Sequence, residues 1–349
     1  MAIAASTAIA ALAAVDVWLH GKFERSAGFN IWGYRGPVAA RKTADEYRVV
    51  VLGGSTVYGY GTTWEESIPA VMDRDLRGRA VGPFRRFSVV NLGYNNEGAY
   101  SFRFTLQDFA YLTPDLAVLY EGYNDLPGDY HPNHALFRHG SPVFALTGYM
   151  PILPLVFNEK ALALRHGGDL GAAYADPEGR GAVVFRPDLA SRATASTLET
   201  IMKFEQSLET PLRRLSNTPA GDGDVITGGC DRPWHSYCES VALAVDYALS
   251  HHQQVIVAGQ PRLMGGELWR RHENQQRALA EMLRQRYGGD RRVRYVDLAY
   301  AIDLSDRRAA PDGMHLRGRA NRGLAQLLVE PILDMLRFSS PGSPPSSRP

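Results

Sequence analysis

Short apolar runs rich in β-branched residues alternate with helix-length amphipathic stretches through most of the chain. Five runs predict strands, at residues 47–52, 87–92, 116–121, 254–258 and 293–298. Amphipathic stretches predict helices at residues 63–76, 99–112, 236–250, 268–286 and 319–336. Strands that alternate with helices pair in parallel, because each helix carries the chain back across the sheet. The pattern therefore predicts an α/β fold, a three-layer α/β/α sandwich around a parallel sheet.

The first of these helices has a specific start signal. Thr63 and Glu66 form a T-x-x-E capping box, which predicts that the helix begins there and continues to about Leu76.

Composition narrows the class of protein. Apolar residues make up 45% of the chain and charged residues 21%, which is typical of a soluble globular protein. Thirty-eight basic and 37 acidic residues leave a net charge of +1, far from the basic excess that binding to a phosphate backbone requires. We expect no nucleic-acid partner.

A long segment interrupts the alternation after the third predicted strand. The main domain spans residues 45–337, and within it residues 126–232 are too many for an ordinary connection, so they predict an insertion or cap. The apolar stretch 142–157 carries internal and flanking prolines, which exclude a continuous membrane-spanning helix. It is either core of the insertion, or a wall of the acyl-substrate site or a patch that lies against lipid. Residues 338–349 are rich in Pro and Ser and predict a disordered tail.

The N-terminal segment, residues 1–25, is apolar and bears no charge before Asp16. It matches neither a full spanning helix nor a typical signal peptide with a basic start. We favour a membrane anchor or export signal, and thus a membrane-anchored, periplasmic or extracellular protein. A buried amphipathic helix in a cytoplasmic protein is the alternative.

The two cysteines, Cys230 and Cys238, are eight residues apart. They are able to close a short loop as a disulfide in an oxidising compartment, or to remain as two free thiols. The sequence leaves both states open.

Small and polar residues follow each of the first three predicted strands. The segments are Gly53-Gly54-Ser55-Thr56, Asn91-Leu92-Gly93 and Gly122-Tyr123-Asn124-Asp125. Ligands of open parallel sheets bind beyond the carboxyl ends of the strands, so these segments mark the expected site.

A carboxylate and an imidazole lie three residues apart in Pro311-Asp312-Gly313-Met314-His315, between the last strand and the last helix. A serine hydroxyl becomes a good nucleophile when a histidine accepts its proton and a carboxylate orients that histidine. Ser55, His315 and Asp312 therefore predict a catalytic triad.

The four blocks GGST, NLG, GYND and DGMH, in that order, resemble those of the SGNH/GDSL hydrolases. This resemblance implies a flavodoxin-like parallel sheet with Ser55 as nucleophile and Asp312 and His315 as its partners. It also implies an oxyanion hole formed by Ser55, Gly93 and Asn124. The chain departs from the family pattern at Gly54, where the family usually has aspartate.

The expected activity is cleavage of an ester, an acyl or acetyl ester of a small molecule, carbohydrate or lipid, through an acyl-enzyme on Ser55. One alternative is an O-acyltransferase that acts on a polysaccharide. Another is a catalytically silent, membrane-anchored scaffold.

We expect neither a cofactor nor a metal. Dinucleotide and P-loop motifs are absent. The histidines at 131, 134 and 139 lack the accompanying Cys or carboxylate spacing of a metal site.

Overall fold

The computed structural model describes residues 2–22, 28–95, 97–126, 141–153, 156, 230–263 and 265–339. It divides into two compact units, one of Met1–Gly33 with Pro142–Asp222 and the other of Tyr34–Ser141 with Gly223–Pro349. We call the second unit the sheet domain. Most of the predicted insertion, including its three histidines, and residues 340–349 of the predicted tail lie outside the described residues.

The sheet domain contains five parallel strands in the order β2-β1-β3-β4-β5. Their bounds are β1 (Glu46–Gly53), β2 (Arg86–Asn91), β3 (Leu116–Tyr120), β4 (Gln254–Ala258) and β5 (Val293–Val296). Every residue of β1 and β3 is buried, as expected for central strands covered on both faces. The order reverses direction at β1 and β3, and the crevice at such a switch point is where ligands of these sheets bind.

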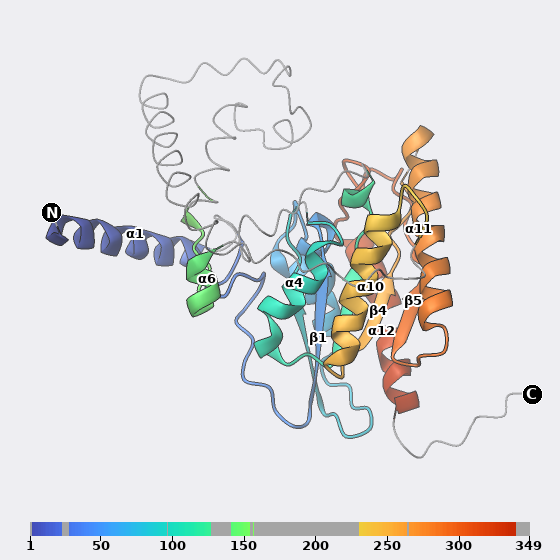
Figure 1. Ribbon diagram of the computed structural model, residues 1–349, viewed down its shortest axis with the longest axis horizontal. Coiled ribbons are helices and arrows are strands. Elements are labelled where there is room, and N and C mark those ends of the chain that lie inside the picture. The colour runs from blue at the N-terminus through green and yellow to red at the C-terminus, as the bar shows by residue number, and fades with distance from the viewer. Residues whose placement is uncertain are drawn as a thin grey trace, which may run out of the picture. The chain divides into compact units, whose positions relative to one another are not determined.

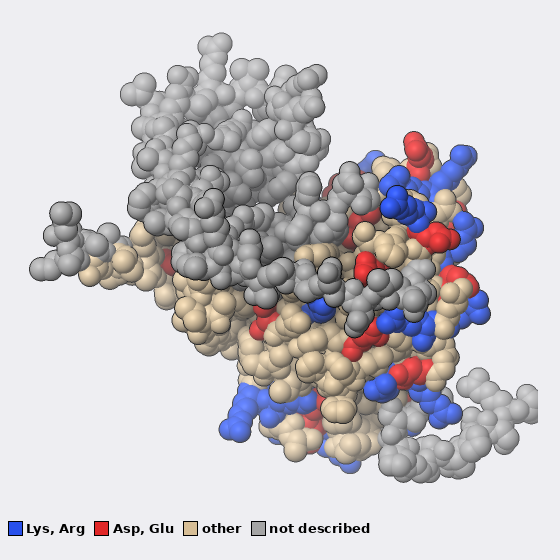
Figure 2. Space-filling model, in the orientation of Figure 1, with Lys and Arg blue, Asp and Glu red and all other residues tan. Residues whose placement is uncertain are grey.

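Helices cover both faces of this sheet (Figure 1). Helix α3 (Ile68–Leu76) packs against β2 and against α12 (Arg319–Ser339). Helix α10 (His235–Ser250) packs against α4 (Ser101–Asp108), β4 and α11 (Gly266–Tyr287). The predicted three-layer α/β/α arrangement is thus confirmed. Basic and acidic side chains are intermixed on the visible face of the described residues (Figure 2).

The predicted capping box at Thr63 and Glu66 is wrong. Trp64–Glu66 forms a separate 3-10 turn, η2, and Thr63 makes no side-chain capping bond. Helix α3 begins only at Ile68, after an extended Ser67. Pro69 explains this start, because a residue without an N–H fits the first turn of a helix and not its interior.

The predicted helix at residues 99–112 is also interrupted before its expected end. Helix α4 stops at Asp108, and the 3-10 turn η3 (Ala110–Leu112) follows it.

The first unit is built on α1 (Ala2–Lys22) and α6 (Pro142–Thr147). Asp16 of α1 is buried and accepts hydrogen bonds from the Tyr149 hydroxyl and from the N–H groups of Ile152 (2.9 Å) and Leu153 (2.7 Å). Further along the same helix, Trp18 is 59% exposed. Among the described residues, no helix has both the length and the apolar character needed to cross a bilayer.

Cys230 and Cys238 form a disulfide, with their Cα atoms 5.7 Å apart. Cys238 belongs to the first turns of α10, so the bond ties the chain that precedes this helix to the helix itself. Of the two states that the sequence leaves open, the structure has the disulfide.

Candidate active site

Ser55 is the first residue of the short helix α2 (Ser55–Tyr58), which starts immediately beyond β1. The strand and the helix are joined at Gly54, where a Cβ would lie 2.3 Å from Asn124 Nδ2 and 2.8 Å from the Glu97 carbonyl oxygen. Real side chains do not make contacts this short, so the turn requires a glycine. The sequence thus presents Ser55 at the carboxyl edge of the sheet, next to the turn after β3.

Ser55, His315 and Asp312 form a continuous hydrogen-bonded chain. Ser55 Oγ lies 2.7 Å from His315 Nε2, although the two residues are 260 positions apart in the sequence. His315 Nδ1 lies 2.5 Å from Asp312 Oδ2. A proton on Nδ1 would be held by the carboxylate, which leaves Nε2 free to accept the proton of the serine hydroxyl.

The Asp312 carboxylate also shapes the loop that carries His315. Its Oδ1 accepts the backbone N–H of Met314 at 3.0 Å and that of His315 at 2.8 Å. Burial alone would raise the pKa of Asp312, but its hydrogen bonds with His315 and with these two N–H groups lower it below the ordinary value. The side chain of Asp312 is 51% exposed and that of His315 is 18% exposed, so the imidazole edge lies near solvent.

Tyr60 is a further residue of the site, and sequence reasoning missed it. Its ring centroid lies 4.8 Å from that of His315, and its backbone N–H donates to the Ser55 carbonyl at 2.9 Å. Tyr60 therefore contacts the candidate base and is tied to the residue that carries the candidate nucleophile.

Asn124 lies in the 3-10 turn η4 (Tyr123–Asp125), directly after β3. Its side-chain Nδ2 donates one hydrogen bond, to the Glu97 carbonyl at 2.8 Å. An amide nitrogen carries two hydrogens, so one remains for a ligand. Among the described residues, none accepts the backbone N–H of Ser55. Two donors of the predicted oxyanion hole thus lie on either side of Gly54.

The structure places Gly93 differently from the expected oxyanion donor. Its N–H donates to Asn91 Oδ1 at 2.9 Å, so this donor already has a partner within the chain. A Cβ at Gly93 would lie 2.5 Å from the Tyr58 backbone nitrogen and 2.9 Å from the Val57 carbonyl carbon. The close packing of the loop after β2 on α2 explains why residue 93 is a glycine. The bond to Asn91 is a common local one, because an Asn side chain readily accepts the N–H two residues later.

Glu121 is the second residue that sequence reasoning missed. It follows β3 directly, is 3% exposed, and its carboxyl group accepts backbone N–H groups of Gly54, Gly122 and Asn124. Burial and the nearby Asp125 carboxyl group raise the pKa of Glu121 to about 8, even though the three N–H groups oppose this shift. No sequence signal marks this role, because it depends on a contact across 67 positions.

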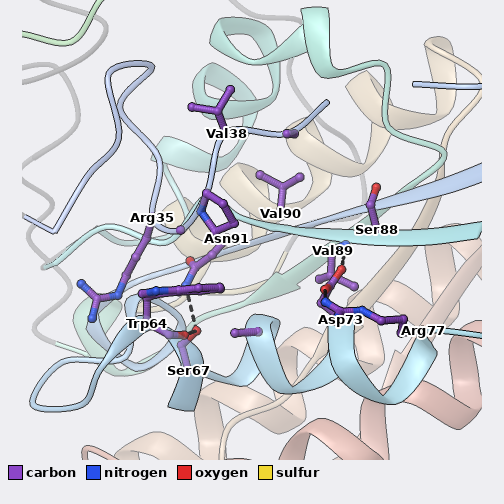
Figure 3. A pocket seen from close by; sticks show the side chains of 14 residues that line it. Arg35, Val38, Trp64, Ser67, Asp73, Arg77, Ser88, Val89, Val90 and Asn91 are labelled. Carbon is purple, nitrogen blue, oxygen red and sulfur yellow. Dashed lines mark hydrogen bonds and ion pairs between the residues drawn. The ribbon is translucent and has the colours of Figure 1, made fainter. Parts of the chain in front are cut away.

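Described residues of the sheet domain line a smaller and a larger hollow. The smaller, about 170 Å³, lies between residues 35–39, α3 and β2, and includes Trp64, Ser67 and Asn91 (Figure 3). The larger, about 680 Å³, is lined by residues on both sides of the Asp312–His315 loop, among them Asp303, Arg308 and Arg317. None of its lining residues is Ser55, Asp312 or His315.

The described part of the chain contains no group of three or more His, Cys, Asp or Glu side chains arranged to hold a metal ion.

No family model matches the sequence, and the curated proteins contain no match to it. The chain is similar to several solved structures. One is a lipolytic protein of the G-D-S-L family from Desulfitobacterium hafniense, at 11% identity and a TM-score of 0.41, covering 82% of this chain and 98% of that one. Another is a carbohydrate acetylesterase from Sinorhizobium meliloti, at 10% identity and a TM-score of 0.42, covering 83% and 99%. A third is a mutant acetylxylan esterase from Geobacillus stearothermophilus, at 10% identity and a TM-score of 0.42, covering 83% and 94%.

Proposed function

We propose that this protein is a serine esterase of the SGNH/GDSL type. The observation that carries the proposal is the hydrogen-bonded chain from Ser55 Oγ through His315 to Asp312, with distances of 2.7 and 2.5 Å, at the switch point of the sheet. A serine, a histidine and a carboxylate in this geometry are the machinery of acyl transfer.

In the proposed reaction, Ser55 Oγ attacks the ester carbonyl carbon while His315 Nε2 accepts the hydroxyl proton. The C–O bond to the leaving alcohol then breaks, and His315 gives the proton to the alcohol oxygen. Water attacks the acyl-enzyme with His315 again as base, which releases the acid and restores Ser55. Asp312 stays ionised and holds the imidazole, and the lowered pKa of Asp312 supports this role.

The oxyanion of each tetrahedral intermediate is stabilised by the Ser55 N–H and by the second hydrogen of Asn124 Nδ2. Gly93 contributes packing against α2 rather than a hydrogen bond, since its N–H is held by Asn91. Donors fixed in place before reaction stabilise developing charge better than water, which must reorient.

We propose an acyl or acetyl ester of a carbohydrate or lipid as the substrate class, because this is the class that the four sequence blocks imply.

We also propose that the protein works in an oxidising compartment outside the cytoplasm. The Cys230–Cys238 disulfide supports this location, because such bonds persist in exported proteins and are rare in the cytosol. We propose further that the uncharged stretch of α1 before Asp16 serves as a membrane anchor or export signal.

The test of the proposed activity combines fluorophosphonate labelling with p-nitrophenyl acetate turnover. We expect the wild type to be labelled at Ser55 and to turn over the ester. Ser55→Ala and His315→Ala should each lose turnover by about 10³-fold or more, because neither retains an activated nucleophile. Ser240→Ala and His251→Ala, which change a half-buried serine and an exposed histidine of the α10 region, are the matched controls and should keep full turnover.

Absence of both labelling and turnover in the wild type would favour a silent scaffold instead. Labelling without hydrolysis, with mass-spectrometric detection of acylated glycan when a glycan acceptor is added, would identify an acyltransferase.

A further inference from the structure

The proposed reaction assigns no task to the buried carboxyl group of Glu121. Glu121 is 3% exposed and lies between the strand end that carries Ser55 and the turn that carries Asn124. Burying a carboxyl group is costly unless hydrogen bonds compensate, so its partners indicate what it is there to hold.

The two oxygens of Glu121 bind different turns. Oε2 accepts the Gly54 N–H at 2.6 Å, on the turn after β1. Oε1 accepts the N–H of Gly122 at 2.9 Å and that of Asn124 at 3.2 Å, on the turn after β3. One carboxyl group therefore bridges the residue before the candidate nucleophile and the backbone of the oxyanion asparagine.

The residue itself is fixed from a third element. The Tyr237 hydroxyl of α10 donates to the Glu121 carbonyl oxygen at 2.9 Å, and both groups are buried. The carboxyl group therefore extends from a backbone that is anchored independently of the two turns that it joins.

The absence of a side chain at position 54 fits the same arrangement. A Cβ built on Gly54 would lie 2.5 Å from Glu121 Oε2. The Glu121 carboxyl group thus occupies the space that a side chain at position 54 would take. Where similar sequence blocks have an aspartate before the serine, this chain brings a carboxyl group to the same turn from the end of β3.

We propose that Glu121 is a positioning residue, whose carboxyl group holds the Ser55 turn and the Asn124 turn at the spacing that the oxyanion requires. The inference rests on the proposed esterase function. It assigns Glu121 no contact with substrate, and its effect on catalysis passes through the Ser55 N–H and the Asn124 amide.

The test is Glu121→Gln, assayed with p-nitrophenyl acetate. Glutamine keeps the size and one acceptor oxygen, but its amide nitrogen would face an N–H of one of the two turns, which leaves that turn unheld. Fluorophosphonate labelling to completion counts the active sites, so that kcat is expressed per labelled site and loss of folded protein does not enter it. We expect kcat per site to fall by about 10- to 100-fold while KM stays within about twofold, as for loss of an interaction made mainly in the transition state.

Glu46→Gln is the matched control. Glu46 is also buried, but it lies at the opposite end of β1 and binds Arg48 and Ser88. Loss of the Glu46 carboxylate should lower the midpoint temperature of thermal unfolding and leave kcat per labelled site unchanged. The inference is overturned if Glu121→Gln keeps kcat per site within twofold of wild type, or if Glu46→Gln loses kcat per site to the same extent.

A second variant covers the case in which Glu121→Gln does not fold. Gly54 has φ −79° and ψ −149°, and a Cβ there would lie 2.5 Å from Glu121 Oε2 and 2.8 Å from the Glu97 carbonyl oxygen, so Gly54→Ala forces the Glu121 carboxyl group and its neighbours to shift. We expect kcat per site to fall here too, and an unchanged value would overturn the inference. A wild type that neither labels nor turns over would instead refute the proposed function, and this inference with it.

Discussion

Asn124 performs two tasks with one side-chain amide. One hydrogen of Nδ2 is fixed on the Glu97 carbonyl oxygen, and Nδ2 itself lies beside Gly54, the residue before Ser55. The side chain is thus set before substrate arrives, which is the condition for strong stabilisation of an oxyanion.

We predict that Asn124→Ala lowers kcat by about 10²- to 10³-fold, the usual effect of losing one oxyanion donor. Little stability should be lost, because the side chain is only partly buried. Turnover of p-nitrophenyl acetate together with thermal unfolding tests this, and Asn274→Ala, at an exposed position of α11, is the control. A rate equal to wild type would remove Asn124 from the oxyanion hole.

At the residue scale, the sequence predicts the members of the triad better than what surrounds them. Ser55, Asp312 and His315 follow from short motifs at strand ends, and the structure brings the three together. No such motif marks Glu121 or Tyr60, because their roles arise from contacts between segments that are distant in the sequence. The partner of the Gly93 N–H depends on a local turn that composition does not specify.

At the scale of elements, strands are predicted more closely than the starts of helices. The predicted strand 254–258 has the same bounds as β4, since a buried apolar run bounded by polar residues leaves little freedom. The start of α3 is misplaced by several residues because Thr63 and Glu66 compete with Ser67 and Pro69 as start signals. Two valid signals in one short stretch need tertiary packing to decide between them.

The disulfide fixes the entry into α10. Cys230 and Cys238 are both buried, and the loop that they close is short. We predict that Cys230→Ser/Cys238→Ser lowers the free energy of unfolding by about 2–3 kcal/mol, the chain-entropy value for such a loop. Urea unfolding of the variant beside the wild type, with and without reductant, measures the difference. Equal stability of oxidised wild type and variant would show that the bond contributes nothing.

At the scale of the whole molecule, buried ionisable groups make stability depend on pH. Burial and the nearby Asp125 carboxyl group raise the pKa of Glu121 to about 8, and burial raises the pKa of Asp125 to about 7. An acid whose pKa is raised by folding stabilises the folded state below its unfolded pKa, and that contribution is lost as pH rises through the folded value. Burial lowers the pKa of His272 to about 4, which costs stability as pH falls below about 6.5.

The window between pH 6.5 and 8 therefore reports on the carboxyl pair together with His20, whose pKa is raised, in spite of its burial, by hydrogen bonds with Asp16, Phe29 and Met150. We predict that the free energy of unfolding falls by on the order of 2 kcal/mol across this window, at about 1.4 kcal/mol per proton and pH unit. Asp125→Asn should flatten the dependence, because the remaining carboxyl group loses its charged neighbour. Urea unfolding at pH 6.5 and at pH 8 tests the role of the Glu121–Asp125 pair. An equal fall in the free energy of unfolding in wild type and variant would contradict this role.

One side chain contacts both the residue that follows η4 and the residue that precedes α10. Arg271 of α11 donates through Nε to the Leu126 carbonyl at 2.5 Å, and its guanidinium lies 5.1 Å from the centre of the Trp234 ring. Leu126 and Trp234 are thus held by the same guanidinium group. A change in the length of the chain between them need not disturb the strands that hold the triad, because β3 ends before Leu126 and β4 begins after Trp234.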